Sequence, residues 1–244
     1  MHHLNWYEQI PAFHSLNNWL VEIGILKEGH SSQHLVSFVL IFILLTFVSV
    51  KVGRRYRNVE EAVIPPKKFG LTNLFEFMVE RLYNLVTDVI GPEGGKHFPF
   101  LGAIFIIIFF NNLLGMIPGF PPATSTIATN AAIALSVFVY YNAVGIREHG
   151  FGYIKQFAGP VVWLAWLMIP IELVGHFVRP VSLSLRLAGN ITGDHMVLGV
   201  FTGMTYFLIP VVFFVLGVFV CFIQAFVFTL LSSIYIALAE SHDH

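Results

Sequence analysis

The chain has 244 residues, of which 56% are hydrophobic and only 11% are charged, and its formal net charge at pH 7 is -1. Soluble domains carry about 25% charged residues, so this composition excludes an ordinary soluble domain, and the near-neutral charge argues against a nucleic-acid-binding surface. The single cysteine, Cys221, excludes an internal disulfide. We therefore expect one membrane domain over residues 1–244.

The first apolar segment, residues 34–52, is long enough to cross the hydrocarbon core, which takes about 20 residues. Residues 1–33 before it are polar and aromatic, with a short interfacial helix predicted around 16–23. Basic residues follow the segment directly: Lys51, Arg54, Arg55, Arg57, Lys67 and Lys68. The positive-inside rule places this end in the cytoplasm and the N-terminus outside.

Residues 71–90 differ in kind from this span. Their apolar side chains follow one helical stripe, and acidic, basic and amide side chains occupy the rest of the surface. This pattern predicts an amphipathic interfacial helix, which lies on the membrane surface or packs against a partner. We expect Gly91-Pro92 and Gly94-Gly95 to end it.

Residues 98–146 predict a helical hairpin that crosses the membrane twice, with spans at 98–120 and 127–146. The proline- and threonine-rich sequence PPATST connects them. Near the end of the first span, Asn111 and Asn112 interrupt the apolar run. Amide side chains in membrane helices commonly bond to a neighbouring helix, so we expect interhelical hydrogen bonds here.

Residues 158–239 contain two long apolar stretches, 158–201 and 206–239. A helix of about 40 residues is about 60 Å long, twice the hydrocarbon thickness. Either the first helix begins along the membrane surface, or it crosses at a steep tilt with kinks at Pro170 and Pro180. The fold class expected is an all-α polytopic membrane protein with about five crossings, the last two long and tilted as a hairpin, and a cytoplasmic C-terminus.

The few charged groups in this last part of the chain form a pattern. Between residues 156 and 239 the only formally charged side chains are Glu172, Arg179, Arg186 and Asp194. At 100° per residue these four fall in one quarter of a helix surface, together with His176 and Asn190, while His195 lies opposite. On the second stretch, Gly217, Gln224 and Tyr235 fall within about 20° of one another and predict a matching polar line.

Two interpretations of these charges are open. The first is a buried ion-pair network that holds the bundle together, with pairs such as Glu172–Arg179. The second is that Arg186 pairs with a carboxylate on another chain, because the nearest acid in sequence is eight residues away. An arginine at the centre of a membrane helix costs about 3 kcal/mol, so an unpaired one requires a partner or water. We favour the second interpretation.

Four segments carry a resemblance to a known family. RPVSLSLRLAGN and IQAFVFTLLSSIYIALA are similar to subunit a of the F-type ATP synthase, and NLLGMIPGF and PIELVGHFVRP also fit that family. The resemblance covers nearly the whole chain. It implies a non-catalytic stator subunit that forms two aqueous half-channels to the carboxylates of the rotating c-ring, and so couples proton flow to rotation and ATP synthesis.

The resemblance also implies roles for single residues. Arg186 matches the family's essential arginine, which faces the carboxylate of each passing c subunit, and Gln224 matches the glutamine beside it. Asn190 matches a polar residue of the half-channel open to the outside. Glu172 matches an acid of the half-channel leading to the cytoplasm, and Tyr235 matches a polar position near the cytoplasmic end of the last helix.

The sequence departs from the family at the relay of the outer half-channel. Many bacterial members have glutamate nine residues after the arginine, where this chain has His195, preceded by Asp194. Members with histidine there often have an acid on the last helix, but that position is Gly217. Asp194 and His195 are therefore both candidates for the relay, and His176 is a further candidate for proton translocation.

The partners implied are the c-ring, the b subunits of the peripheral stalk, the rest of the ATP synthase and the lipid bilayer, with no cofactor, metal or nucleic acid. The location implied is a bacterial inner membrane. A secondary ion transporter is the alternative, but it predicts inverted repeats, and residues 71–90 have no counterpart in the second half. A membrane hydrolase would need a nucleophile–base pair or a motif such as HExxH, which the sequence lacks.

Overall fold

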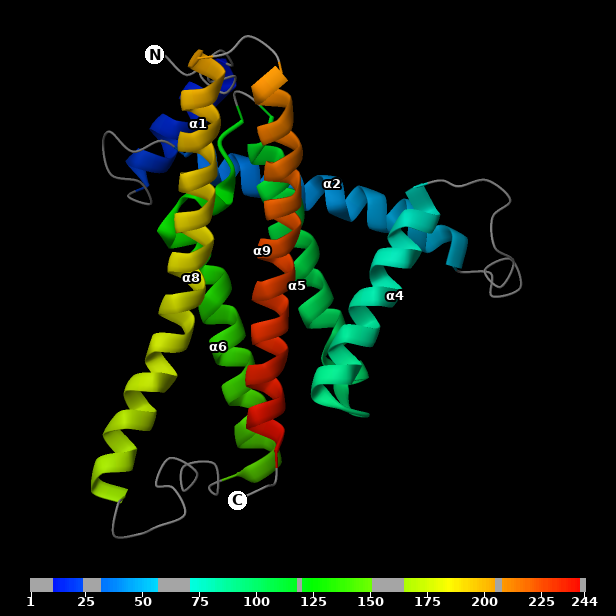
Figure 1. Ribbon diagram of the computed structural model, residues 1–244, viewed down its shortest axis with the longest axis vertical. Coiled ribbons are helices and arrows are strands. Elements are labelled where there is room, and N and C mark those ends of the chain that lie inside the picture. The colour runs from blue at the N-terminus through cyan, green and yellow to red at the C-terminus, as the bar shows by residue number, and fades with distance from the viewer. Residues whose placement is uncertain are drawn as a thin grey trace.

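The computed structural model describes residues 11–23, 32–56, 71–117, 120–150, 165–204 and 208–241, and every regular element in these ranges is helical. The elements in chain order are α1 (Pro11–Glu22), α2 (Gln33–Tyr56), α4 (Leu71–Ile90), α5 (Gly94–Gly115), the 3-10 turn η2 (Ala123–Ser125), α6 (Ile127–His149), α8 (Ala165–Met204) and α9 (Leu208–Glu240). α5, α6, α8 and α9 run along the long axis of the molecule, and α2 lies across them (Figure 1).

Four of the described helices are long and apolar enough to cross a membrane: Gln33–Gly53, Gly94–Gly115, Ile127–His149 and Val211–Glu240. The remaining predicted crossing corresponds to α8, which is 40 residues long. It is not among these four helices, and it carries all four charged side chains of the polar stripe. The chain is an integral membrane protein with several membrane-spanning helices.

α2 contains the first predicted span and continues to Tyr56, into the basic segment. The fully buried Ser37 donates a hydrogen bond to the carbonyl of Pro121 at 2.7 Å. This bond and contacts with α5 and η2 fix the first half of α2 against the bundle, whereas its later residues, such as Phe47, are largely exposed. The predicted interfacial helix corresponds to α1, which begins earlier than expected, at Pro11.

α4 runs over the same residues as the predicted amphipathic helix. It ends at Ile90, and the next residue, Gly91, has a positive φ of 95° that suits glycine and an N–H that bonds to the carbonyl of Thr87. Leu82 and Val86 are buried in the core shared with α5 and α9. The later part of the apolar stripe of α4 therefore packs within its own chain, whereas Leu74 and Phe77 near its start are exposed.

The first helix of the hairpin has different bounds from those predicted. α5 begins at Gly94 and ends at Gly115, whereas the pattern predicted a span over 98–120. Gly94 is the first residue of α5 and does not interrupt the helix. A Cβ atom at Gly94 would lie 2.9 Å from the carbonyl oxygen of Val86, so glycine lets the start of α5 approach α4 closely. Gly115 ends the helix where the ring of Pro122 packs against it.

The two asparagines of α5 behave differently. Asn112 accepts a hydrogen bond from Thr124 Oγ1 at 2.7 Å, which joins α5 to η2. Asn111 donates to the carbonyl of Ile107 in its own helix and makes no bond to another helix in the described part of the chain, which contradicts the interhelical bond predicted for it. At the start of α6, Asn130 donates to the carbonyl of Thr124, and these buried amides thus hold the turn of the hairpin together.

α8 and α9 are the two long helices predicted over 158–201 and 206–239; residues 158–164 lie outside the described part. Pro170 and Pro180 lie inside α8 and do not end it, and the first half of α8 leans away from α9 (Figure 1). Leu183, Leu187 and Ile191 of α8 join the core formed by α5, α6 and α9.

Candidate functional site

Two contacts define how the antiparallel helices α8 and α9 face each other. At one end the guanidinium carbon of Arg179 lies 5.3 Å from the ring centroid of Tyr235. At the other end Asp194 lines a cavity together with Gly217 and Cys221. The polar stripe of α8 therefore follows the seam between the two helices.

Arg186 and Asn190 form the outer edge of this stripe, and both are exposed. Arg186 makes no salt bridge with any residue that the structure describes. The neighbouring surface of α8 is apolar, with exposed side chains before and after the arginine: Val178, Val181, Leu185, Met196 and Val200. The arginine is thus a single cation on a surface suited to lipid or to another apolar helix.

Gln224 lies on α9 in the middle of the same seam. Arg186 is seven residues after Arg179 and eight before Asp194, and the antiparallel register places Gln224 within about one turn of its level. The side chain of Gln224 is buried, and no described side chain forms a hydrogen bond with it.

Glu172 and Arg179 form the only salt bridge within α8 among the described residues, with Arg179 Nη2 at 3.5 Å from Glu172 Oε1. The side chains are 44% and 26% exposed, respectively. A long, partly solvated pair of this kind contributes little to stability. The pair leaves the Glu172 carboxylate open to solvent at the end of the seam where Tyr235 also lies.

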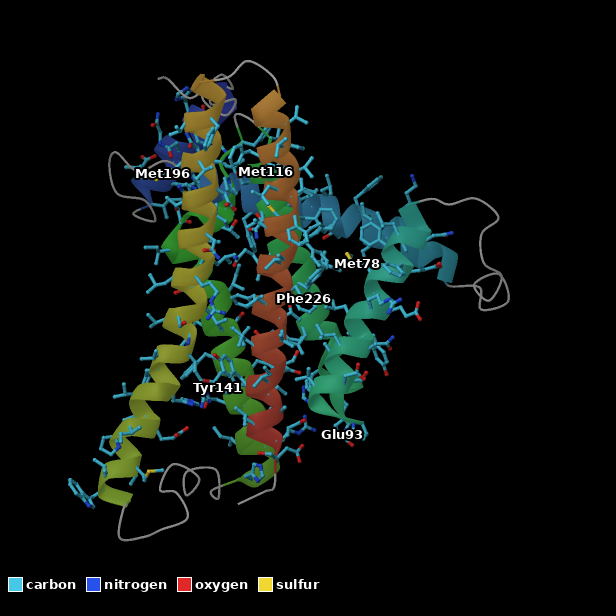
Figure 2. The ribbon with its side chains drawn as sticks, viewed as in Figure 1. Met78, Glu93, Met116, Tyr141, Met196 and Phe226 are labelled. Carbon is cyan, nitrogen blue, oxygen red and sulfur yellow. The ribbon has the colours of Figure 1, made fainter. Side chains whose placement is uncertain are left out.

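His176 occupies the inner edge of the stripe and is buried against α6. Its Nε2 atom lies 2.8 Å from Asn142 Oδ1, and the Tyr141 hydroxyl lies 3.5 Å from both ring nitrogens. Figure 2 labels Tyr141 on α6 in the lower part of the bundle. The ring of Tyr141 also contacts Tyr235, with centroids 5.9 Å apart, so residues of three helices meet here.

Asp194 is half-buried at the other end of the seam, where it lines a cavity of about 180 Å³. Asn112 of α5 and Met116, the residue that follows α5, line the same cavity. The Nδ2 atom of Asn112 is buried and makes no hydrogen bond within the described part of the chain. The cavity therefore combines a carboxylate and an unsatisfied amide donor, which is a suitable lining for water.

Gly217 on α9 lines the same cavity as Asp194. A Cβ atom at Gly217 would approach the Cε and Sδ atoms of Met116 within 3 Å, so the thioether occupies the space that a side chain of residue 217 would need. The backbone of His195 continues α8, and its side chain lies outside the described part.

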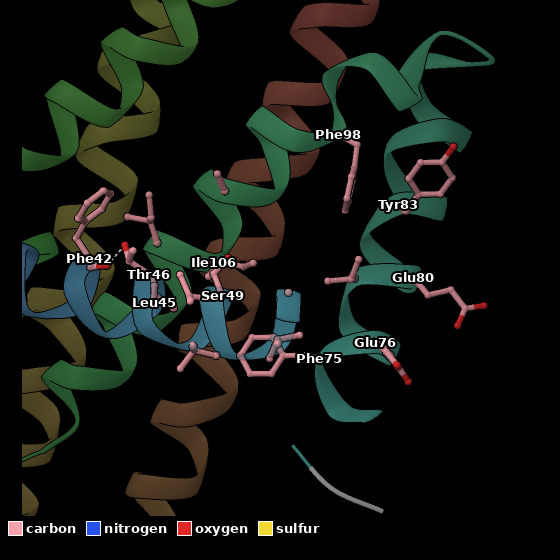
Figure 3. A pocket seen from close by; sticks show the side chains of 17 residues that line it. Phe42, Leu45, Thr46, Ser49, Phe75, Glu76, Glu80, Tyr83, Phe98 and Ile106 are labelled. Carbon is pink, nitrogen blue, oxygen red and sulfur yellow. Dashed lines mark hydrogen bonds between the residues drawn. The ribbon is translucent and has the colours of Figure 1, made fainter. Parts of the chain in front are cut away.

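A larger cavity of about 840 Å³ lies between α2, α4 and α5, away from the polar stripe. Its lining is mainly apolar, and the carboxylates of Glu76 and Glu80 point away from α2 at its edge (Figure 3). The described residues contain no group of three histidine, cysteine or acidic side chains that could hold a metal ion. The polar stripe is therefore the candidate site.

Several residues of this site escaped the sequence analysis. The position of Tyr141 near the end of a predicted span fits an aromatic belt, and the sequence pattern assigns no role to Asn142 or Met116. An asparagine inside an apolar span is a usable signal, because an amide in a membrane helix needs a partner. Nothing in the sequence identifies that partner as His176, which is 34 residues away.

Comparison with known proteins agrees with this picture. The family model described as "ATP synthase A chain" matches residues 34–237. A protein of Bdellovibrio bacteriovorus named ATP synthase subunit a is 44% identical over 88% of this chain and 95% of its own length. ATP synthase subunit a 1 of Syntrophotalea carbinolica is 44% identical over 93% of this chain and 96% of its own length. The chain therefore belongs to the ATP synthase A chain family.

Proposed function

We propose that this chain is the proton-translocating stator subunit of a rotary F-type ATP synthase. In this proposal it forms two aqueous half-channels that lead to the carboxylates of a c-ring, with Arg186 between them, and it carries no catalytic site of its own. The observation that supports this most directly is the exposed position of Arg186 on an apolar surface without a carboxylate partner among the described residues.

The isolated cation accounts for proton release beside it and for the separation of the two half-channels. A carboxylic acid must be neutral to face lipid, and an arginine within a few ångströms lowers its pKa and favours the ionised form. The acid of a c subunit would release its proton into one half-channel, pass Arg186 as an anion and take a proton from the other. Arginine stays charged where lysine could lose its proton, so it also prevents protons from passing directly between the half-channels.

The two ends of the seam supply the half-channels in this proposal. Asn190 and the cavity beside Asp194 belong to the half-channel open to the outside, with His195 as a second candidate for the relay. Glu172, His176 and Tyr235 belong to the half-channel leading to the cytoplasm. Gln224 lies between them near the level of Arg186.

The crossing of the helices supports a strong tilt of the channel hairpin. α2 has 24 residues, about 36 Å, and suits an upright span of hydrocarbon about 30 Å thick. α8 and α9 cross α2 (Figure 1), so if α2 is upright they are steeply tilted. Tilted helices of 40 and 33 residues can stay within the membrane over more of their length.

The proposal includes the surroundings of the subunit. The membrane is the bacterial inner membrane, with the N-terminus outside and the C-terminus in the cytoplasm. The c-ring contacts the face of Arg186, and the b subunits of the peripheral stalk hold the subunit in place.

The test uses membrane vesicles that contain the whole complex. We expect Arg186→Ala to abolish both ATP-driven proton pumping and potential-driven ATP synthesis, and Arg186→Lys to lose most of both, while the complex still assembles. Arg81→Ala is the matched control, because Arg81 lies over the ring of Phe77 on α4, outside the seam. Coupled activity at the wild-type level in Arg186→Ala would contradict the proposal and leave a structural role for this arginine.

A further inference from the structure

His176 lies in a slot formed by α6. The ring of Phe138 contacts the imidazole at an interplanar angle of 61° with centroids 5.0 Å apart, and the ring of Tyr141 at 81° and 5.2 Å. The Asn142 amide lies beside the Nε2 atom. The imidazole is thus enclosed by two aromatic rings, with Asn142 beside Nε2 and the Tyr141 hydroxyl 3.5 Å from both nitrogens.

The hydrogen bonds of Asn142 determine which nitrogen carries the hydrogen. Asn142 Nδ2 donates to the carbonyl of Phe138 at 2.7 Å, and a carbonyl can only accept, so the amide nitrogen must face it. The amide oxygen therefore faces His176 at 2.8 Å. Because this oxygen also only accepts, Nε2 of His176 must donate, and in the neutral ring Nδ1 is then the nitrogen that can accept a proton. The Tyr141 hydroxyl lies 3.5 Å from this Nδ1 atom.

The charged and titratable groups around His176 come from three helices. Glu172 precedes it by one turn of α8 and Arg179 follows it by nearly one turn, and both interact electrostatically with the imidazole. α6 contributes the Tyr141 hydroxyl, and α9 contributes Tyr235, which contacts Arg179 and Tyr141. Glu172 is the most exposed of these groups and lies one turn from the buried imidazole.

We propose that Asn142 and Tyr141 of α6 are positioning residues of the cytoplasmic half-channel, which hold His176 so that its Nδ1 atom takes up and releases the translocated proton. This inference rests on the proposed function. Nδ1 takes a proton and the neutral ring becomes imidazolium; Nδ1 then passes that proton to the Glu172 carboxylate or to water, and the ring is neutral again. Nε2–H stays bonded to Asn142 throughout, so the ring keeps its place.

The experiment measures initial rates of ATP-driven pumping in inverted vesicles that contain the whole complex. The pH is varied in the outer medium, which bathes the cytoplasmic face of the membrane in such vesicles. Gln in place of His keeps a donor for Asn142 but does not titrate. We expect His176→Gln to lower the pumping rate at least about tenfold, because a positioned proton-transfer group contributes at least that much to a rate. We also expect it to remove one limb of the pH profile. Asn142→Ala shifts the midpoint of that limb, and Asn142→Asp, which keeps the acceptor, restores most of the rate.

Val137→Ala is the matched control, because Val137 is fully buried on α6 and makes no polar contact with His176. We expect it to change the amount of assembled complex and not the pH profile. A wild-type rate and profile in His176→Gln would overturn the inference, as would an Asn142→Ala variant that only reduces assembly, as Val137→Ala does. Normal activity of Arg186→Ala would instead contradict the proposed function, so the two failures are distinguishable.

Discussion

At the scale of single residues, the cavity beside Asp194 depends on a glycine and a methionine. Met116 occupies the space next to Gly217, where a Cβ atom would meet its Cε atom at 2.4 Å. The thioether is the flexible end of its side chain, and the neighbouring cavity of about 180 Å³ gives it room to move. Any side chain at residue 217 would therefore push Met116 into the cavity that Asp194 and Asn112 share.

We expect Gly217→Ala to reduce ATP-driven pumping severalfold while the complex remains assembled, because the displaced Met116 removes space for water beside Asp194. The double variant Gly217→Ala, Met116→Ala should recover most of the rate. The measurement is the initial pumping rate per assembled complex. If the double variant pumps no better than Gly217→Ala, the cavity has no part in proton transfer.

At the scale of elements, a buried polar cluster joins three helices. His97 Nε2, at the start of α5, lies 2.6 Å from Glu240 Oε1 at the end of α9. His97 Nδ1 lies 3.0 Å from the Tyr140 hydroxyl on α6. A neutral imidazole satisfies both partners by donating from Nε2 and accepting at Nδ1. The cluster therefore holds the end of α9 against the start of α5.

We expect His97→Ala to destabilise the subunit by about 1–3 kcal/mol, because Glu240 and Tyr140 lose a partner in a largely buried place. The measurement is the temperature at which half of the purified complex dissociates, which should fall by a few degrees. Lys96→Ala is the control: Lys96 pairs with Glu93 at the exposed surface, and exposed pairs contribute little. Equal shifts for both variants would show that the buried cluster contributes no more to stability than the exposed pair.

At the scale of the whole molecule, apolar side chains cover the outer surfaces of α2, α8 and α9. Among these surfaces, that of α8 contains the exposed Arg186 and Asn190. Gly189 lies one turn from Arg186 on this face, and a Cβ atom there would meet no other atom within 4 Å. This is the face that we assign to the c-ring, and lipid would cover α2.

We expect Gly189→Cys, in a Cys221→Ser background, to cross-link to a cysteine placed beside the carboxylate of the c subunit. Phe47→Cys on α2 is the control, because Phe47 is 70% exposed on the surface assigned to lipid. The measurement is the cross-linked product on a denaturing gel after oxidation. Cross-linking of Phe47→Cys but not of Gly189→Cys would place the c-ring against another face.

The sequence by itself determined the class of protein and most of its elements. Apolar runs interrupted by few charges mean membrane helices, because burial in hydrocarbon excludes most charged side chains. The period of the apolar stripe over 71–90 was enough to predict α4, which has these bounds. The polar stripe of α8 also follows from the sequence, because the spacing of charged residues along one helix fixes their direction around its axis.

The tertiary structure decided which side of that stripe faces inward and what it meets there. It places His176 and Asp194 toward the bundle and leaves Arg186 and Asn190 outside. In the structure α5 begins at Gly94, earlier than predicted. The sequence pattern treats this glycine as a helix breaker, but the close packing of α5 on α4 requires it. The partners Asn142 and Met116 depend on how helices distant in sequence cross and on their register, and no periodicity within a single helix contains that information.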